Sequence, residues 1–161
     1  MTTPTWSSDD AGALRTDHEA WMRQAMAEAR LAASKGNVPV GSVVVREGRI
    51  VARGHNEVVS GHDPTAHAEI VALRRAGAAL DTPALTGCTL YTTLEPCPMC
   101  AAALVWARVD RVVIGALFPR TGGVRSLARI LDLMGPVIHR VEVVAEVLPQ
   151  ECLALLPPDY R

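Results

Sequence analysis

Aromatic side chains and long apolar runs are both scarce in this chain of 161 residues. Phe, Trp and Tyr together make up 4% of it. The longest uninterrupted apolar run, residues 99–107, falls far short of the roughly 20 residues that a membrane-spanning helix needs. The first residues contain no apolar stretch behind a basic start, which a secretory signal would show. We therefore expect no membrane partner and a cytoplasmic location.

Cysteine is sparse as well, since the chain has four. That number is too small for a disulfide framework in a chain of this size. Two of the four form a Cys97-x-x-Cys100 pair, a spacing that indicates metal or redox chemistry in a cytosolic protein. Cys88 and Cys152 lie among apolar neighbours, and we expect them to pack in the core.

An excess of charge of one sign is also missing. Lys and Arg number 16 against 17 Asp and Glu, for a net charge of −1, so the chain as a whole has no cationic field to attract nucleic acid. Residues 103–140 hold six arginines and two aspartates, whereas residues 141–161 hold one arginine and four acidic residues. The arginines more readily form a solvated face than a track for RNA.

Apolar residues make up 49% of the chain, which is enough for a core and excludes disorder. We expect a flexible leader over residues 1–15 and a single domain over residues 16–161. Within the domain a capping box at Thr16 predicts a first helix that ends before Gly36. Further helices are expected over residues 66–76, from residue 96 or 98 to residue 108, and over residues 126–133 and 151–156. Strands are expected over residues 41–46, 49–56, 88–93, 111–116 and 141–148.

This order of elements predicts the fold class. A hairpin turned at Glu47-Gly48, followed by alternating strands and helices, favours an α/β protein with one mixed sheet and helices on both faces. The strands over residues 88–93 and 111–116 should be parallel, because a helix connects them. We find no repeat and no second domain.

Two short motifs carry the chemistry. His67-Ala-Glu69 and Pro96-Cys97-Pro98-Met99-Cys100 are each predicted to open a helix. Imidazole and thiolate are ligands that zinc prefers, and three protein ligands with a water make a catalytic site. The positive end of the helix dipole stabilises thiolates at Cys97 and Cys100. The sequence therefore predicts one zinc ion per chain, held by His67, Cys97 and Cys100.

Glu69 completes the predicted site as a carboxylate that is not a ligand. Zinc lowers the pKa of its water and so provides a nucleophile at neutral pH. A carboxylate beside that water can take its proton and pass it to a leaving amine, which makes Glu69 the candidate catalytic residue. The pattern His-x-Glu…Pro-Cys-x-x-Cys is typical of zinc-dependent deaminases. The expected reaction is hydrolysis of an exocyclic amine on a purine- or pyrimidine-type ring, with release of ammonia.

Four segments resemble those of bacterial tRNA adenosine deaminases in the cytidine-deaminase superfamily, and the similarity runs from about residue 17 to residue 156. They are Val38-Pro-Val-Gly41, Gly54-His-Asn56, His62-Asp-Pro-Thr-Ala-His-Ala-Glu-Ile70 and Thr93-Leu-Glu-Pro-Cys97. The resemblance implies a three-layer α/β/α sandwich around the mixed sheet of five strands, a zinc cofactor and a homodimer. It also implies that Asn56 contacts the substrate, and we expect Ala68 beside it.

The resemblance breaks after the fourth strand and at the end of the chain. The tRNA enzymes usually read Gly-Ala-x-Asp-Pro-Lys-x-Gly-Ala, where this chain has Phe118 for the acidic residue near the substrate ribose. Arg125 stands where a small residue is expected. The chain ends Pro157-Pro-Asp-Tyr-Arg161 instead of in a basic helix that grips RNA. Phosphate contacts dominate RNA affinity, so these departures weaken the interpretation as a tRNA enzyme.

Three functions stay open at this point. The departures favour deamination of a free base, a nucleoside or a related small heterocycle, with Phe118 stacking on the ring. The alternative is conversion of adenosine to inosine at the wobble position of a tRNA anticodon. A zinc-binding module without activity, serving as a dimer partner, is the third, although a structural zinc site does not need Glu69. Met99, Ala103 and Trp106 share a helical face that a homodimer could bury.

Overall fold

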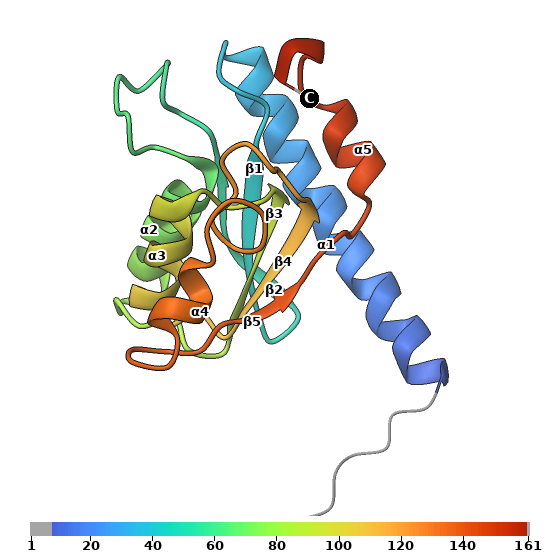
Figure 1. Ribbon diagram of the computed structural model, residues 1–161, viewed down its shortest axis with the longest axis vertical. Helices are drawn as coiled ribbons and strands as arrows, with labels where there is room; N and C mark the ends of the chain where they lie inside the picture. The colour runs from blue at the N-terminus through green and yellow to red at the C-terminus, as the bar shows by residue number, and fades with distance from the viewer. Residues whose placement is uncertain (1–7, 161) are drawn as a thin grey trace, which may run out of the picture.

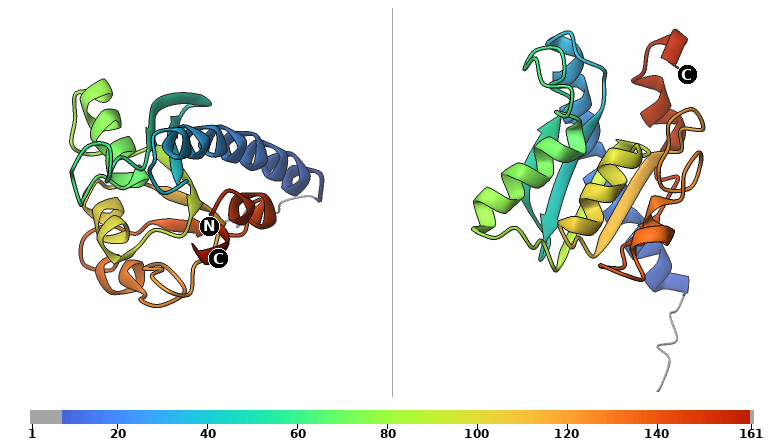
Figure 2. Two further views of the ribbon diagram at one scale, coloured as in Figure 1. Left: turned by 90° about the horizontal axis from the view of Figure 1, so that it is seen from above. Right: turned by 60° about the vertical axis from the view of Figure 1, so that its left-hand side comes forward.

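The computed structural model describes residues 8–160, which form a five-stranded sheet between two layers of helices (Figure 1). The strands are β1 (Gly41–Arg46), β2 (Arg49–His55), β3 (Cys88–Leu94), β4 (Arg111–Ala116) and β5 (Glu142–Val144). The helices are α1 (Ser8–Ser34), α2 (Ala68–Leu80), α3 (Pro98–Trp106), α4 (Ile130–Met134) and α5 (Pro149–Ala154), followed by a 3-10 turn, η1 (Pro158–Tyr160). Helices α2, α3 and α4 cover one face of the sheet and α1 and α5 the other, so the expected three-layer α/β/α fold is confirmed (Figure 2).

The strands are arranged in the order β2-β1-β3-β4-β5. Strand β1 pairs antiparallel with β2 and with β3, whereas β3, β4 and β5 run parallel to one another. The sheet is therefore mixed, and the parallel pairing expected for β3 and β4 is confirmed. Glu47 and Gly48 form the predicted two-residue turn, with φ angles of 51° and 69°, the left-handed region that such hairpins require.

Each face of the sheet has its own apolar core. The core under α2 and α3 includes Val44, Leu90, Leu104 and Ile114, and the core under α1 includes Met22, Val43 and Tyr91. Helix α2 lies very close to β2 at Gly54, where a Cβ atom would stand 2.6 Å from the carbonyl oxygen of Ala68. This close approach requires glycine, and it sets the first turn of α2 over the end of β2.

Some boundaries differ from those predicted. Helix α1 begins at Ser8, so residues 8–15 of the expected leader are helical, while residues 1–7 lie outside the described residues. Helix α2 begins at Ala68, two residues later than predicted, with His67 at its N-cap, because Thr65, a residue type that commonly caps helices, is bound elsewhere. The amide and hydroxyl of Thr65 both donate to Oδ1 of Asp63, at 2.8 and 2.7 Å. Strand β5 and helix α4 are shorter than expected, whereas β1 and β4 have the predicted bounds.

Within residues 8–160, no helix is both long enough and apolar enough to cross a membrane.

Candidate metal centre and substrate cavity

Three strands end at one edge of the sheet and place the candidate site there. His55, the last residue of β2, lies opposite Gly41 at the start of β1, and Leu94 of β3 lies opposite Ala116 of β4. The segments that follow these strands therefore meet at this edge, where α/β proteins commonly bind their ligands. Asn56 follows β2, Cys97 follows β3 shortly after its end, and Phe118 follows β4.

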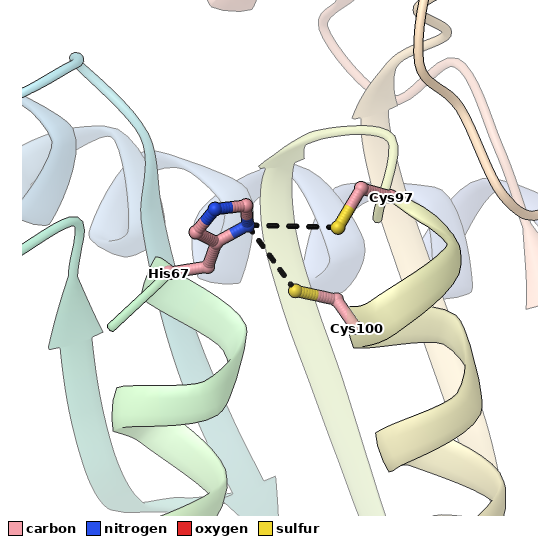
Figure 3. A group of neighbouring side chains, drawn as sticks. All are labelled: His67, Cys97 and Cys100. Atoms are coloured by element: carbon pink, nitrogen blue, oxygen red, sulfur yellow. Dashed lines mark hydrogen bonds between the residues drawn. The ribbon is translucent and has the colours of Figure 1, made fainter. Parts of the chain in front are cut away.

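The structure brings together the three residues predicted to bind a metal. Nδ1 of His67 lies 3.6 Å from Sγ of Cys97 and 3.5 Å from Sγ of Cys100, and the ligand atoms of all three lie within 4.8 Å of one another (Figure 3). Nitrogen and sulfur ligands at about 2.1 and 2.3 Å from one tetrahedral ion stand about 3.6 Å apart. The donor set and its spacing therefore fit zinc, with Nδ1 as the imidazole ligand.

Local helix geometry explains why these side chains converge. His67 and Cys97 are the N-cap residues of α2 and α3, and both have extended backbone conformations that turn their side chains to the front of the helix. Pro98 takes the first helical position after Cys97, where its missing N–H costs no hydrogen bond. Cys100 lies in the first turn of α3. The two helix starts lie side by side, and the side chains of His67, Cys97 and Cys100 converge between them (Figure 3).

The electrostatics of the cluster favour one negative charge on sulfur before any metal binds. A hydrogen bond with Cys100 is the main cause that lowers the pKa of Cys97 to about 4, and His67 contributes in the same direction. The same hydrogen bond, together with burial, raises the pKa of Cys100. The hydrogen bond with Cys97 also raises the pKa of His67. These shifts favour the thiolate form of Cys97, which is the form that binds a metal.

Glu69 lies beside the cluster as predicted. Its side chain is buried, with an exposed fraction of 4%, and burial raises the pKa of its carboxyl group to about 7. Glu69 belongs to the first turn of α2, two residues after His67, and it lines the cavity that opens onto the metal cluster. A carboxyl group with a pKa near the working pH can both accept and release a proton.

A cavity of about 210 Å³ opens onto the metal cluster. Asn56, Ala68 and Phe118, the three residues expected at the substrate, all line it together with His67 and Cys97. Drug-sized ligands occupy cavities of about 300–1,000 Å³, so this volume suits one flat ring. The predicted residues therefore converge on one cavity.

Asn56 is held firmly at the cavity wall. It is buried, its backbone N–H donates to the carbonyl of Val40 at 3.0 Å, and its Oδ1 accepts from the N–H of Val58 at 3.2 Å. Asn37 stabilises the segment that follows Val58, because its Oδ1 accepts from the amides of Val59 and Ser60 at 2.9 and 3.1 Å. Sequence reasoning missed this role of Asn37.

Two further residues of the cavity were missed. Tyr160 lines the cavity from the far end of the chain and stacks on Phe118. Only its aromatic character after two prolines could have drawn attention to it. Glu95 is buried in the cavity wall between β3 and Cys97. The signal that could have revealed it is its place in the motif Thr93-Leu-Glu-Pro-Cys97, directly after a strand without charged residues. A carboxylate buried there needs hydrogen-bond donors around it.

A buried carboxylate beside one imidazole and two thiolates, at the floor of a cavity that fits a single ring, is the arrangement of a zinc-dependent hydrolytic deaminase. Residues 15–116 match the family model of the cytidine and deoxycytidylate deaminase zinc-binding region. The chain belongs to this family, and it is a zinc-binding enzyme that hydrolyses C–N bonds.

Relatives and solved structures agree with this assignment. A tRNA-specific adenosine deaminase of Bacillus subtilis is 44% identical over 146 residues, which cover 91% of this chain and 90% of the relative. A structure from a study of A-to-I editing by tRNA:A34 deaminases matches with a TM-score of 0.80 and 40% identity, over 85% of this chain and 99% of that one. A guanine deaminase of Nitrosomonas europaea matches with a TM-score of 0.75 and 28% identity, over 85% and 81%.

Proposed function

We propose that this chain is a tRNA adenosine deaminase that converts adenosine to inosine at the wobble position of an anticodon. The observation that carries the proposal is the similarity to the Bacillus subtilis tRNA-specific adenosine deaminase, which extends over nine-tenths of both chains. This relation favours the tRNA alternative over the free small ring that the departures at Phe118 and in the acidic tail suggested. An enzyme acting on tRNA would work in the cytoplasm, as expected from the sequence.

The proposed reaction replaces the exocyclic amine of the base by oxygen from water and releases ammonia. His67, Cys97 and Cys100 would hold zinc, which when bound activates a water at neutral pH. Glu69 would take a proton from that water on a carboxylate oxygen and deliver it to the departing amine. Its buried position at the cavity floor supports this role, because no bulk water competes for the proton there.

The cavity wall would hold the base in place for this step. The carboxamide oxygen of Asn56 already accepts from the N–H of Val58. The side chain is therefore oriented before the base binds, and little side-chain conformational entropy is lost on binding. Ala68 leaves room between the metal ligands and the ring, and Phe118 offers an aromatic face. A base inside an anticodon loop reaches such a cavity only when it turns out of its stack. The volume of about 210 Å³ supports entry of one base.

A second candidate is deamination of a free purine base. The observation in its favour is the aromatic pair of Phe118 and Tyr160 at the cavity, which narrows the space around the ring. The similarity to the guanine deaminase of Nitrosomonas europaea points the same way, although its identity of 28% is lower. The two candidates share the metal cluster and Glu69 and differ in what surrounds the ring.

A substrate panel separates the candidates. The zinc-loaded enzyme would be incubated with an anticodon stem-loop RNA that carries adenosine at the wobble position, and separately with adenosine, adenine, guanine and cytidine, while released ammonia is measured. We expect turnover of the RNA at a kcat/KM far above that of every free compound. Preferential release of ammonia from guanine or another free ring would support the second candidate. Glu69→Gln serves as the inactive control in each assay.

A further inference from the structure

The carboxylate of Glu95 accepts an unusual number of hydrogen bonds. Its Oε1 accepts from the backbone amides of Val124, Arg125 and Ser126, at 3.2, 2.7 and 2.9 Å. Its Oε2 accepts from the amide of Phe118 at 2.8 Å and from the hydroxyl of Ser126. Successive backbone amides that point at one anion form a strong and directional cradle.

All of these donors belong to one segment, residues 117–126, which follows β4. We call this segment the β4 loop. Glu95 itself belongs to the chain between β3 and the zinc ligand Cys97, and its backbone amide donates to the carbonyl of Ala116 at 2.8 Å. A side chain two residues before a metal ligand therefore holds the part of the cavity wall in which Phe118 lies.

Close backbone packing strengthens this link. The amide of Gly123 donates to the carbonyl of Pro96 at 2.7 Å. A Cβ atom at Gly122 would stand 2.3 Å from the carboxyl group of Glu95, so only glycine leaves room for that group. With an exposed fraction of 3%, Glu95 is also shielded from water that would compete for these amides. The β4 loop is thus attached to the metal-ligand segment by side-chain and main-chain contacts.

We propose that Glu95 is a positioning residue that fixes the distance between the metal cluster and the Phe118 wall, and so sets how the substrate ring lies over the reacting water. The inference rests on the proposed deaminase reaction but not on the identity of the ring. Glu95 itself does not touch the reacting atoms in this account. It acts through the amide of Phe118 and through the three amides of residues 124–126.

Glu95→Gln tests this account more sharply than a truncation. A glutamine has one oxygen, which can keep the three amides of residues 124–126, and one NH₂ group, which cannot accept. The hydroxyl of Ser126 can rotate to accept from that NH₂ group, whereas the amide of Phe118 can only donate. The variant therefore leaves the N–H of Phe118 without a partner and keeps most of the remaining cradle. A matched control is Glu142→Gln, which removes an exposed carboxylate paired with Arg111.

Three readouts are measured on the zinc-loaded protein, with whichever compound of the panel the wild type deaminates. Zinc content should equal that of the wild type. Amide hydrogen exchange should speed up at Phe118 while the strand amides stay protected. A misplacement of about 1 Å between reacting groups can cost on the order of 100-fold in rate, so we expect kcat/KM to fall about 10–100-fold, through a lower kcat as well as a higher KM. Glu142→Gln should match the wild type in all three.

Gly122→Ala disturbs the same contact from the β4 loop. It tests the proposal if Glu95→Gln does not fold. Its added Cβ must displace the carboxyl group of Glu95, and we expect the same fall in kcat/KM with zinc retained. Two results would overturn the proposal. One is unchanged kcat/KM in a variant whose Phe118 amide exchanges faster. The other is loss of zinc or of the folded state in both variants, which would make Glu95 a structural residue. Neither result depends on whether the ring belongs to RNA, which the substrate panel decides.

Discussion

Tyr160 stacks on Phe118 in the wall of the substrate cavity, with ring centroids 6.2 Å apart and ring planes within 13° of parallel. Tyr160 belongs to the 3-10 turn η1 near the end of the chain, and Phe118 belongs to the β4 loop. Arg120 adds a contact between the same two segments, since its Nη1 donates to the carbonyl of Asp159 at 3.5 Å. The last turn of the chain thus forms part of the cavity wall.

Removing the ring of Tyr160 should therefore weaken substrate binding. An aromatic pair contributes about 0.5–1.5 kcal/mol, which corresponds to a rise in KM of about 2–10-fold in Tyr160→Ala, with little change in kcat. Tyr160→Phe keeps the ring and should behave as the wild type. Steady-state kinetics on the preferred substrate measure the effect. If Tyr160→Phe were as impaired as Tyr160→Ala, the hydroxyl and not the stack would be responsible.

The metal cluster predicts one zinc ion per chain. Cys97→Ser and His67→Ala should each lose zinc and activity, because three ligands whose atoms lie within 4.8 Å of one another act as a unit. Elemental analysis of the purified protein gives the zinc content. Cys152→Ala, which removes a buried thiol on the other face of the sheet, should keep it. Zinc retained in both ligand variants, or zinc coordinated by Glu69 in place of water, would contradict the assignment.

Glu69 is expected to move protons without holding the metal. In Glu69→Ala the zinc content and the fold should persist, while turnover falls about 10²–10⁴-fold or more, because the proton carrier is gone. The comparison of zinc content with kcat in one preparation separates the two roles. A variant that loses zinc along with activity would show that Glu69 is a ligand, and a nearly normal rate would show that it is a bystander.

The exposed face of α3 predicts a homodimer. Met99 and Trp106 have exposed fractions of 37% and 67%, large values for apolar side chains on one short helix. Trp106→Glu should shift the protein toward the monomer, because it would bury a charge in the interface. Light scattering at micromolar concentration measures the mass. Leu133→Glu, at an equally exposed position on α4, should leave the mass unchanged. A monomeric wild type would refute the prediction.

Local patterns were sufficient for much of the fold. The β-branched runs at Gly41–Arg46 and Arg111–Ala116 have the predicted bounds, because each is flanked by turn residues that stop a strand. The start of α2 was misplaced because of a local turn. Thr65 looks like a cap in sequence, but its amide and hydroxyl donate to Asp63 two residues earlier, and α2 begins only after His67.

The residues of the candidate site that belong to short sequence motifs could be predicted. His67, Glu69, Cys97 and Cys100 belong to two such motifs, and the structure brings them together. Tyr160 could not be predicted, because it reaches the cavity only through the path of the last turn. Glu95 belongs to a recognisable motif, yet the groups that bind its carboxylate are backbone amides of the β4 loop. The sequence does not show which backbone amides will lie near a given side chain.

The proposed function requires that the enzyme deaminate a single adenosine in an RNA loop. The most direct measurement is nucleoside analysis of an anticodon stem-loop RNA, with adenosines at the wobble position and elsewhere in the loop, after incubation with the zinc-loaded enzyme. The account predicts inosine at the wobble position alone, formed by the wild type and absent with Glu69→Ala. An RNA that stays unmodified while the same enzyme releases ammonia from guanine or another free ring would contradict it.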